Sequence, residues 1–278
     1  KRQHLHRLLE QQPDFVLLQE LHATTANVVV WEHPLGYRLF HANGTTASAE
    51  VGILVKLDFL GLFLPHTSQQ LEEVTPGRIG ALRLRGPLGN LDLFAVYLST
   101  GDAAADRAQQ RAALARSIST PDTTLSVIGG DFNYAAMTED RACLNTLAWT
   151  GHRQSKEEED FRQNVCVPKQ MFELEQDDFT HRSSLGLSRI DRIYTNFDAS
   201  RQLDHTVSCV ALPWPPTLVS AHRPLLFHVK PPQPRNADHP YIPDHITQHP
   251  DWRHRVVSLH QHWLRQEAAV TKVDCLRS

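Results

Sequence analysis

Residues 125–133 read LSVIGGDFN, a short apolar run followed directly by two glycines, a carboxylate and an amide. The apolar part, residues 125–128, is typical of a buried strand. Asp131 and Asn133 stand two residues apart after it, so their side chains should point in the same direction at the end of that strand. This spacing indicates a cleft at one edge of a sheet, although Asp and Asn after a strand are also common turn formers.

Three other segments place polar side chains beside short apolar runs. Gln19 and Glu20 follow the run at residues 15–18, and hard divalent cations such as Mg²⁺ prefer carboxylate oxygens of this kind. Asp191 stands among apolar neighbours in the motif SRIDRIY, and His222 stands in SAHRP just before another apolar run. Taken singly, Asp191 also fits an ordinary salt-bridged strand residue and His222 a turn histidine.

Hydrophobic periodicity predicts many strands and a few helices over the rest of the chain. The segment at residues 91–97 is apolar nearly throughout, which is typical of a strand covered on both faces. This order of elements favours a layered α/β or α+β arrangement over a barrel of regular βα repeats. Further strands are expected at residues 51–56, 81–85, 190–195, 206–212 and 225–229, and helices at residues 1–12, 104–118 and 138–149.

Two segments carry more specific expectations. The helix at residues 104–118 is expected to bury the face that carries Ala108, Ala112, Ala115 and Ile118. The stretch at residues 155–178 is strongly acidic and is expected to form a solvated loop, because a run of like charges disfavours a packed element.

The composition is that of an ordinary globular protein. The chain has 278 residues, of which 41% are hydrophobic and 21% charged, enough for one large domain. We expect this domain at residues 1–230, followed by a Pro-rich linker and a C-terminal helical tail at residues 231–278. The formal net charge of −3 excludes a globally basic surface, so nucleic-acid binding would need a local basic patch and a metal ion.

Neither a membrane span nor an export signal is expected. The sequence has no apolar run of about 18–20 residues, and its first residues are amphipathic rather than charged and then apolar. The four cysteines are widely spaced and form no CxxC pair, which suggests neither a zinc site nor a disulfide framework. These features favour an intracellular, reducing compartment, either the nucleus or the cytoplasm.

In their order along residues 1–230, the motifs resemble the endonuclease/exonuclease/phosphatase superfamily, including its deoxyribonuclease-like and AP-endonuclease-like members. The motifs are the strand ending in QE, Arg78 in PGR, Tyr97 in VY, then GDFN, SRID and finally SAHRP. The resemblance implies an α+β fold, a four-layered α/β/β/α sandwich of two mixed β-sheets flanked by helices. It also implies phosphoester hydrolysis assisted by Mg²⁺ or Mn²⁺.

The resemblance implies a role for each motif residue. Glu20 would bind the metal ion, Asp131 would orient or deprotonate the attacking water, and Asn133 would hydrogen-bond the phosphate. His222 would contact the phosphate or share the proton transfer, with Asp191 holding its ring. The remaining candidates are Tyr97 beside the phosphate or leaving group, Arg78, Thr180 and Arg189 as phosphate-binding residues, and a basic strip of Arg182, Arg189, Arg192 and Arg223 for nucleic acid.

Two departures from the family pattern predict a weakened enzyme. The family's last motif is SDH, and Ala221 stands where the family has the aspartate, so metal affinity should fall. The family also has a strand that ends in a metal-binding Asn immediately before the helix matching residues 1–12, and no such strand precedes that helix here. A sheet lacking this first strand would expose unpaired backbone groups and lose a metal ligand.

We therefore predict a metal-dependent phosphodiesterase, an endonuclease that cleaves nucleic acid, with DNA favoured over RNA. The segment after residue 230 resembles a linker to a further domain, which favours the endonuclease domains of retroelements such as retrotransposons. A phosphatase or lipid phosphodiesterase with the same chemistry is the alternative among enzymes. A degenerate binding domain without turnover is the alternative outside them, and the oligomeric state is left open.

Overall fold

The computed structural model describes residues 5, 8–21, 36–41, 51–64, 70–120, 124–151, 153–174, 176, 178–184, 186–197, 206–216 and 220–230. Its contacts divide the chain into one unit of Lys1–Asp198 and Ser208–Phe227 and a second unit of Ala199–Val207 and His228–Ser278. The first unit holds almost all of the described helices and strands, including every strand of the largest sheet. The expected linker and tail at residues 231–278 lie outside the described residues.

Within the described residues, the largest sheet has six strands in the order β4-β5-β6-β7-β12-β9. β6 and β7 run parallel and the other neighbouring pairs run antiparallel, so this sheet is mixed. β6 is covered on both faces, as predicted: Leu93 and Ala95 face one core, and Phe94 and Val96 face another. The strands are β4 (Glu72–Thr75), β5 (Ile79–Gly86), β6 (Gly89–Tyr97), β7 (Thr124–Asp131), β9 (Phe172–Glu173) and β12 (Asp191–Thr195).

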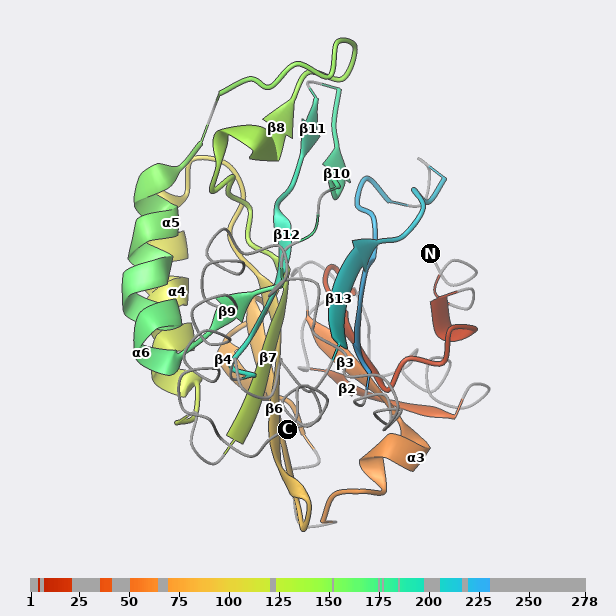
Figure 1. Ribbon diagram of the computed structural model, residues 1–278. Helices are drawn as coiled ribbons and strands as arrows, with labels where there is room; N and C mark the ends of the chain where they lie inside the picture. Colours follow the sequence, from red (N-terminus) through yellow and green to blue (C-terminus); the bar gives the residue numbers. More distant parts are fainter. Residues whose placement is uncertain are drawn as a thin grey trace, which may run out of the picture. The chain divides into compact units, whose positions relative to one another are not determined.

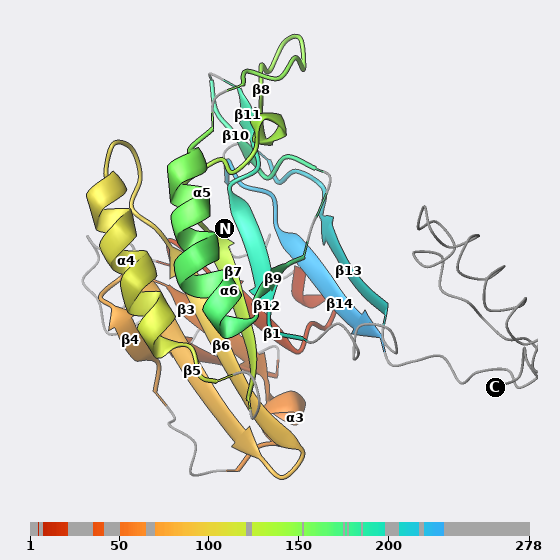
Figure 2. The same ribbon diagram turned by 60° about the vertical axis from the view of Figure 1, so that its left-hand side comes forward.

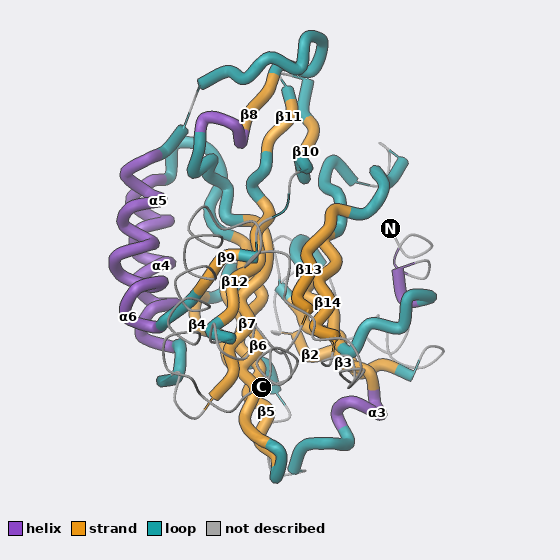
Figure 3. The backbone as a smooth tube through the Cα atoms, in the orientation of Figure 1, coloured by secondary structure: helices purple, strands orange, loops and turns teal. Residues whose placement is uncertain are grey.

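A second layer of strands packs against one face of the six-stranded sheet (Figures 1 and 3). Phe15, Ile53 and Leu93 are among the apolar side chains between the layers. The helical residues Leu5 and Leu9 are buried against the other side of this second layer. Its described parts are the antiparallel sheet β1-β3-β2 and the pair β13-β14, formed by β1 (Phe15–Leu18), β2 (Tyr37–His41), β3 (Gly52–Lys56), β13 (Thr206–Ala211) and β14 (Leu225–Lys230), with the short helix α3 (Leu57–Leu60) after β3.

Helices cover the opposite face of the six-stranded sheet (Figure 2). Leu114 and Phe161 from the helices and Ile128 from β7 are buried in one shared core. The layers therefore follow the order helix, sheet, sheet, helix, which confirms the predicted α+β sandwich. The covering elements are α4 (Ala104–Ser117), α5 (Ser155–Phe161), a π-helical turn (Arg162–Cys166) and α6 (Val167–Lys169).

The helix predicted at residues 138–149 is wrong. The chain instead forms a 3₁₀ turn at Thr138–Asp140 and then the short strand β8 (Arg141–Ala142). Asp140 is fully buried, and its carboxylate accepts two backbone N–H groups and pairs with two arginines near the start of β12. These tertiary partners outweigh the local signal of an acidic first helical turn.

The solvated loop predicted at residues 155–178 is also wrong, because α5, the π-helical turn and α6 occupy its first half. Glu157 of α5 is buried and forms ion pairs of 2.6 Å with Arg107 and 2.7 Å with Arg111, both of α4. Glu157, which lies in the segment predicted to be an acidic loop, therefore neutralises two buried arginines of the neighbouring helix α4.

Ile118 and Ala115 of the predicted buried face of α4 do pack in the core, and the same ion pairs explain why the prediction is wrong for the rest of that face. Ala108 and Ala112 are exposed, whereas Gln110, Leu114 and the two arginines of α4 are buried. Apolar periodicity could not predict this face, because the charged side chains are buried only where α5 supplies their partner.

A small antiparallel sheet of order β10-β11-β8 lies next to the start of β12 (Figure 1). β10 spans His181–Arg182 and β11 spans Leu187–Ser188, and β8 completes the sheet. Among the described residues, no helix combines the length and the apolar character needed to cross a bilayer.

Candidate active site

The candidate active site lies at one end of three neighbouring inner strands of the six-stranded sheet, β6, β7 and β12. β6 and β7 are parallel and end in Tyr97 and Asp131, which pair in the sheet register. β12 runs antiparallel to β7, so Asp191 at its beginning pairs with Asp131. Paired residues on adjacent strands point to the same face of a sheet. The three side chains therefore form one row facing the second layer of strands, because Tyr97 belongs to the core between the two layers.

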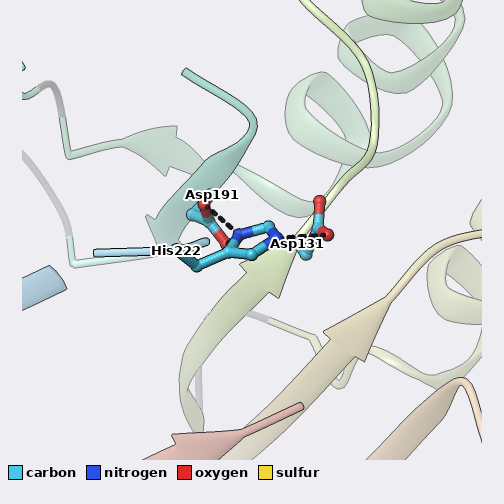
Figure 4. Close-up of side chains that lie close together, drawn as sticks. All are labelled: Asp131, Asp191 and His222. Carbon is cyan, nitrogen blue, oxygen red and sulfur yellow. Dashed lines mark hydrogen bonds and ion pairs between the residues drawn. The ribbon is translucent and has the colours of Figure 1, made fainter. Parts of the chain in front are cut away.

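His222 stands between the two aspartates of this row (Figure 4). Its Nδ1 lies 3.0 and 3.2 Å from the two carboxylate oxygens of Asp191. Its Nε2 lies 3.9 Å from Oδ2 of Asp131. A β-bridge between His222 and His181 holds the backbone of this loop just before β14. The contact with Asp191 therefore fixes the ring with Nε2 directed toward Asp131.

The second layer of strands contributes Glu20, which follows β1. The hydroxyl of Tyr97 donates a hydrogen bond of 2.7 Å to a carboxylate oxygen of Glu20. The guanidinium of Arg78 lies 4.9 Å from the centre of the Tyr97 ring, and its buried Nη1 has no hydrogen-bond partner among the described residues. Burial and the hydrogen bond with Glu20 raise the pKa of Tyr97 to about 12, so this hydroxyl keeps its proton at neutral pH.

Residue 130 must be glycine for Asp131 to take this position. Its φ of +148° is readily adopted only by glycine, and a Cβ there would lie 1.9 Å from the carbonyl oxygen of Val96. Asn133 has a φ of 53° and donates its backbone N–H to Asp131 at 2.8 Å. The side-chain amide of Asn133 donates to the carbonyl oxygen of Leu98, also at 2.8 Å. The GGDFN segment is therefore a fixed turn that holds the Asp131 carboxylate.

Burial and neighbouring charges shift the pKa of the central groups. Burial raises the pKa of Asp131, and the adjacent carboxylate of Asp191 raises it further. Burial by itself would lower the pKa of His222, but the hydrogen bond with Asp191 and its charge outweigh burial and raise that pKa to about 9. His222 is therefore protonated at neutral pH and offsets part of the negative charge of the site.

The side chains fit a hard divalent cation. Glu20, Asp131 and Asp191 bring three carboxylates to one site, and Glu20 is the exposed one of the three. Asp131, Asp191 and His222 each place one ligand atom within 4.8 Å of the others. Carboxylate oxygens in excess over cationic groups suit Mg²⁺ or Mn²⁺ better than softer metals.

Two residues predicted to bind phosphate make structural contacts instead. Thr180 is fully buried, and its Oγ1 accepts the backbone N–H groups of the two residues that lead into β12. Arg189 donates to the carboxylate of Asp140 and to the carbonyl oxygen of Gln176. Both side chains are held by partners inside the folded chain, and they support the position of β12.

The predicted basic strip is not a free surface. Arg192 is 1% exposed, and its guanidinium pairs with Asp140. Arg182 and Arg223 both stack on Trp214, with their guanidinium carbons 5.1 and 5.2 Å from the ring centre. The strip is therefore wrong for Arg192, which is buried in an ion pair, while Arg182 and Arg223 are held by a ring contact that the sequence does not reveal.

The sequence does not single out His181, although the structure places it against His222. The two ring centres are 4.6 Å apart, and Nδ1 of His181 lies 3.0 Å from the hydroxyl oxygen of Ser188. Burial and the charge of His222 lower the pKa of His181, with a smaller contribution from Arg141, so its ring is neutral at neutral pH. A single histidine after Thr180 carries no spacing signal, and only the tertiary structure identifies it.

The structure is thus a layered α+β sandwich with three carboxylates and a histidine gathered at the ends of its strands. The model of the endonuclease/exonuclease/phosphatase family matches residues 1–239. The chain therefore belongs to this family, whose members are hydrolases acting on phosphoesters. No curated protein sequence matches the chain significantly.

Solved structures share the fold at low sequence identity. An AP endonuclease from Archaeoglobus fulgidus matches with a TM-score of 0.56 and 19% identity over 82% of this chain and 95% of that chain. A 3'-5' exonuclease from Neisseria meningitidis matches with a TM-score of 0.56 and 20% identity over 82% and 94%. The endonuclease domain of TRAS1, a telomere-specific non-LTR retrotransposon, matches with a TM-score of 0.52 and 15% identity over 82% and 90%.

Proposed function

We propose that this protein is a metal-dependent phosphodiesterase that cleaves nucleic-acid strands as an endonuclease. One observation carries the proposal: Asp191 holds His222 with its Nε2 facing Asp131, at strand ends where Tyr97 meets Glu20. Phosphoryl transfer needs charge neutralisation and positioned donors more than a covalent nucleophile. This arrangement offers both, and the family assignment supports a phosphoester as the substrate.

Asp131 and His222 can divide the proton transfer between them. The raised pKa of Asp131 suits a group that accepts a proton from an attacking water near neutral pH. His222, with a pKa of about 9, can donate a hydrogen bond from Nε2 to a phosphate oxygen and neutralise charge as it develops. Nε2 of His222 and Oδ2 of Asp131 are 3.9 Å apart, so one oxygen atom can contact both.

The other predicted donors remain part of the proposal. Asn133 uses one amide hydrogen for Leu98 and keeps the second for a phosphate oxygen. Arg78 offers its Nη1, which has no hydrogen-bond partner among the described residues, and Tyr97 offers a hydroxyl beside the phosphate or leaving group. Glu20 would hold Mg²⁺ or Mn²⁺, and the bound ion would neutralise charge on the phosphate.

DNA is the proposed polymer. An AP endonuclease and the endonuclease domain of a retrotransposon are among the structures with a similar fold, which supports DNA over RNA. The second of these also supports the prediction that the chain is an endonuclease domain of a retroelement. Substrate choice in this family lies in loops, so the resemblance in fold supports the polymer class and no particular sequence.

A second candidate is a binding domain that has lost turnover, and Ala221 is the observation that favours it. Ala221 is exposed beside His222, and its backbone carbonyl oxygen accepts a hydrogen bond from the backbone N–H of Arg182. Its methyl group offers no metal or water ligand, so the metal would be held more weakly. The preserved contact between His222 and Asp191 favours a weakened enzyme over this alternative.

Nicking of supercoiled plasmid DNA with Mg²⁺ or Mn²⁺ tests the proposal. We expect metal-dependent nicking by the unaltered protein, and a loss of about 10²-fold or more in Asp131→Asn and His222→Gln, because each removes a proton-transfer group. Asp58→Asn, an exposed residue of α3, is the control and should keep full activity. EDTA should abolish nicking throughout.

The outcomes separate the candidates. Binding of DNA by the folded protein with no nicking under either metal would select the binding domain. Release of phosphate from monoesters without nicking would select the phosphatase alternative. Nicking that survives in both site variants would contradict the site itself.

A further inference from the structure

A row of polar residues extends from His222 across the small sheet. Arg141 of β8 pairs with Ser188 of β11, and Ser188 pairs with His181 of β10. His181 is in turn bridged to His222. The four residues are therefore consecutive partners across three strands and the loop that carries the active-site histidine.

Paired residues across antiparallel strands share one face, and the next pairs along the strands share the other face. The contacts agree with this rule. The ring centres of His181 and His222 are 4.6 Å apart, with the ring planes tilted by 47°, and His181 contacts the Ser188 hydroxyl at 3.0 Å. The neighbouring row contains Leu187 paired with Arg182, so Arg182 lies on the opposite face, where it stacks on Trp214.

The row is rich in hydrogen-bond donors and holds no carboxylate. Arg141 is half-buried and has no ion-pair partner among the described residues. If the Ser188 hydroxyl donates to Nδ1 of His181, then Nε2 of His181 carries the hydrogen and can donate to a ligand. Guanidinium, hydroxyl and imidazole N–H groups together are typical of a site for phosphate oxygens.

The length of the row suits a chain of phosphates. Adjacent strands lie about 4.8 Å apart, so the three steps from His222 to Arg141 cover about 14 Å of backbone. One strand of nucleic acid carries a phosphate about every 3.4 Å along its axis. A polynucleotide can therefore present a second phosphate to the row while its scissile phosphate lies at His222, whereas a substrate with one phosphate has none to present.

We propose that Arg141, Ser188 and His181 form a subsite for a phosphate that flanks the scissile phosphate of a nucleic-acid strand. This proposal rests on the proposed function, because it takes His222 as the residue at the scissile phosphate. The subsite favours polynucleotides over small phosphoesters, and Arg141 adds one positive charge to the phosphate-binding face of a chain whose net charge is −3.

Binding measured without hydrolysis tests the subsite directly. Fluorescence anisotropy of a short single-stranded DNA oligonucleotide in EDTA, over a series of salt concentrations, gives the affinity and its salt dependence. In Arg141→Gln we expect the affinity to fall by about tenfold and the slope of log K against log salt to fall by about 0.7, the value for one phosphate contact.

Two matched variants serve as controls. Arg116→Gln removes the same charge from the exposed last turn of α4 and should leave the salt slope unchanged. Arg182→Gln removes it from the opposite face of the small sheet and should also leave the slope unchanged. Equal loss of slope in all three would show a general charge effect and overturn the subsite.

Hydrolysis supplies a second readout. In Arg141→Gln, kcat/KM should fall for the oligonucleotide and stay unchanged for bis(p-nitrophenyl) phosphate, which has one phosphodiester. An unchanged salt slope with the oligonucleotide, no binding by the unaltered protein, or equal loss on both substrates would overturn the subsite. A reduced slope in a protein that hydrolyses neither substrate would support the subsite and contradict the proposed enzyme.

Discussion

Asp191 controls the charge of His222, because it makes both hydrogen-bond contacts to Nδ1 while Asp131 lies at 3.9 Å. We expect Asp191→Asn to lower the pKa of His222 from about 9 toward its ordinary value near 6.5. An NMR titration of the His222 ring would measure this shift. Asp178→Asn, which alters an exposed carboxylate paired with Arg223, should leave that pKa in place.

The same raised pKa predicts how His222 contributes to stability. Because the folded-state pKa lies above the unfolded value, the contribution is complete below about pH 6.5 and is lost as the pH rises through about 9. The difference in free energy of unfolding between the unaltered protein and His222→Gln should therefore be larger at pH 6 than at pH 10. A difference that grows with pH in urea denaturation would contradict the assignment.

Gly130 has a backbone conformation and surroundings that no other residue fits. Gly130→Ala should lower the free energy of unfolding by about 2–4 kcal/mol, because the new Cβ would meet the Val96 carbonyl oxygen at 1.9 Å and the φ of +148° is strained. Gly151→Ala is the control: its φ is +71°, but nothing lies within 4 Å of the added Cβ. It should cost about 1 kcal/mol. Similar losses from both would show that the contact with Val96 is easily relieved.

At the scale of elements, α4 and α5 are joined by a buried charge network. Glu157→Ala would leave Arg107 and Arg111 buried without their carboxylate, since both side chains are only 4% exposed. We expect a loss of about 3–5 kcal/mol in the free energy of unfolding, measured by chemical denaturation. Glu159→Ala, on the exposed side of α5, breaks an exposed pair with Arg162 and should change stability little. Equal effects would mean that the buried pairs contribute no more than the exposed one.

At the scale of the whole molecule, the proposed domain boundary near residue 230 can be tested by truncation. Removing residues 231–278 should leave the melting temperature and the plasmid-nicking activity nearly unchanged, because the family model and the first unit lie almost entirely before this point. Removing residues 206–278 should instead abolish a cooperative melting transition. That longer truncation takes away Leu225 and Phe227, which pack against the core between the two layers of strands.

An unfolded product from the shorter truncation would contradict the boundary. Circular dichroism melting of the two truncations beside the full chain separates these outcomes. The comparison also shows whether residues 231–278 contribute to the stability of the first unit.

The sequence by itself determined the strands and the residues at their ends. Short apolar runs predicted β1, β3, β6 and β7, because a strand covered on both faces needs apolar side chains in both directions. The segment at residues 190–195, where Asp191 stands among apolar neighbours, predicted β12. The sequence also predicted that Glu20, Asp131, Asp191 and His222 belong together, through the order of motifs along the chain. The structure brings these four residues to one edge, with Tyr97 beside them.

Only the tertiary structure decided which charged side chains are buried and which partners they have. The sequence could not show that Asp140 and Glu157 are buried counter-charges, or that Arg189 and Arg192 form ion pairs with Asp140. It also could not show that Arg141, far along the chain from His222, shares a face with it. The physical reason is that the cost of burying a charge depends on partners distant in sequence, whereas apolar periodicity is a local property.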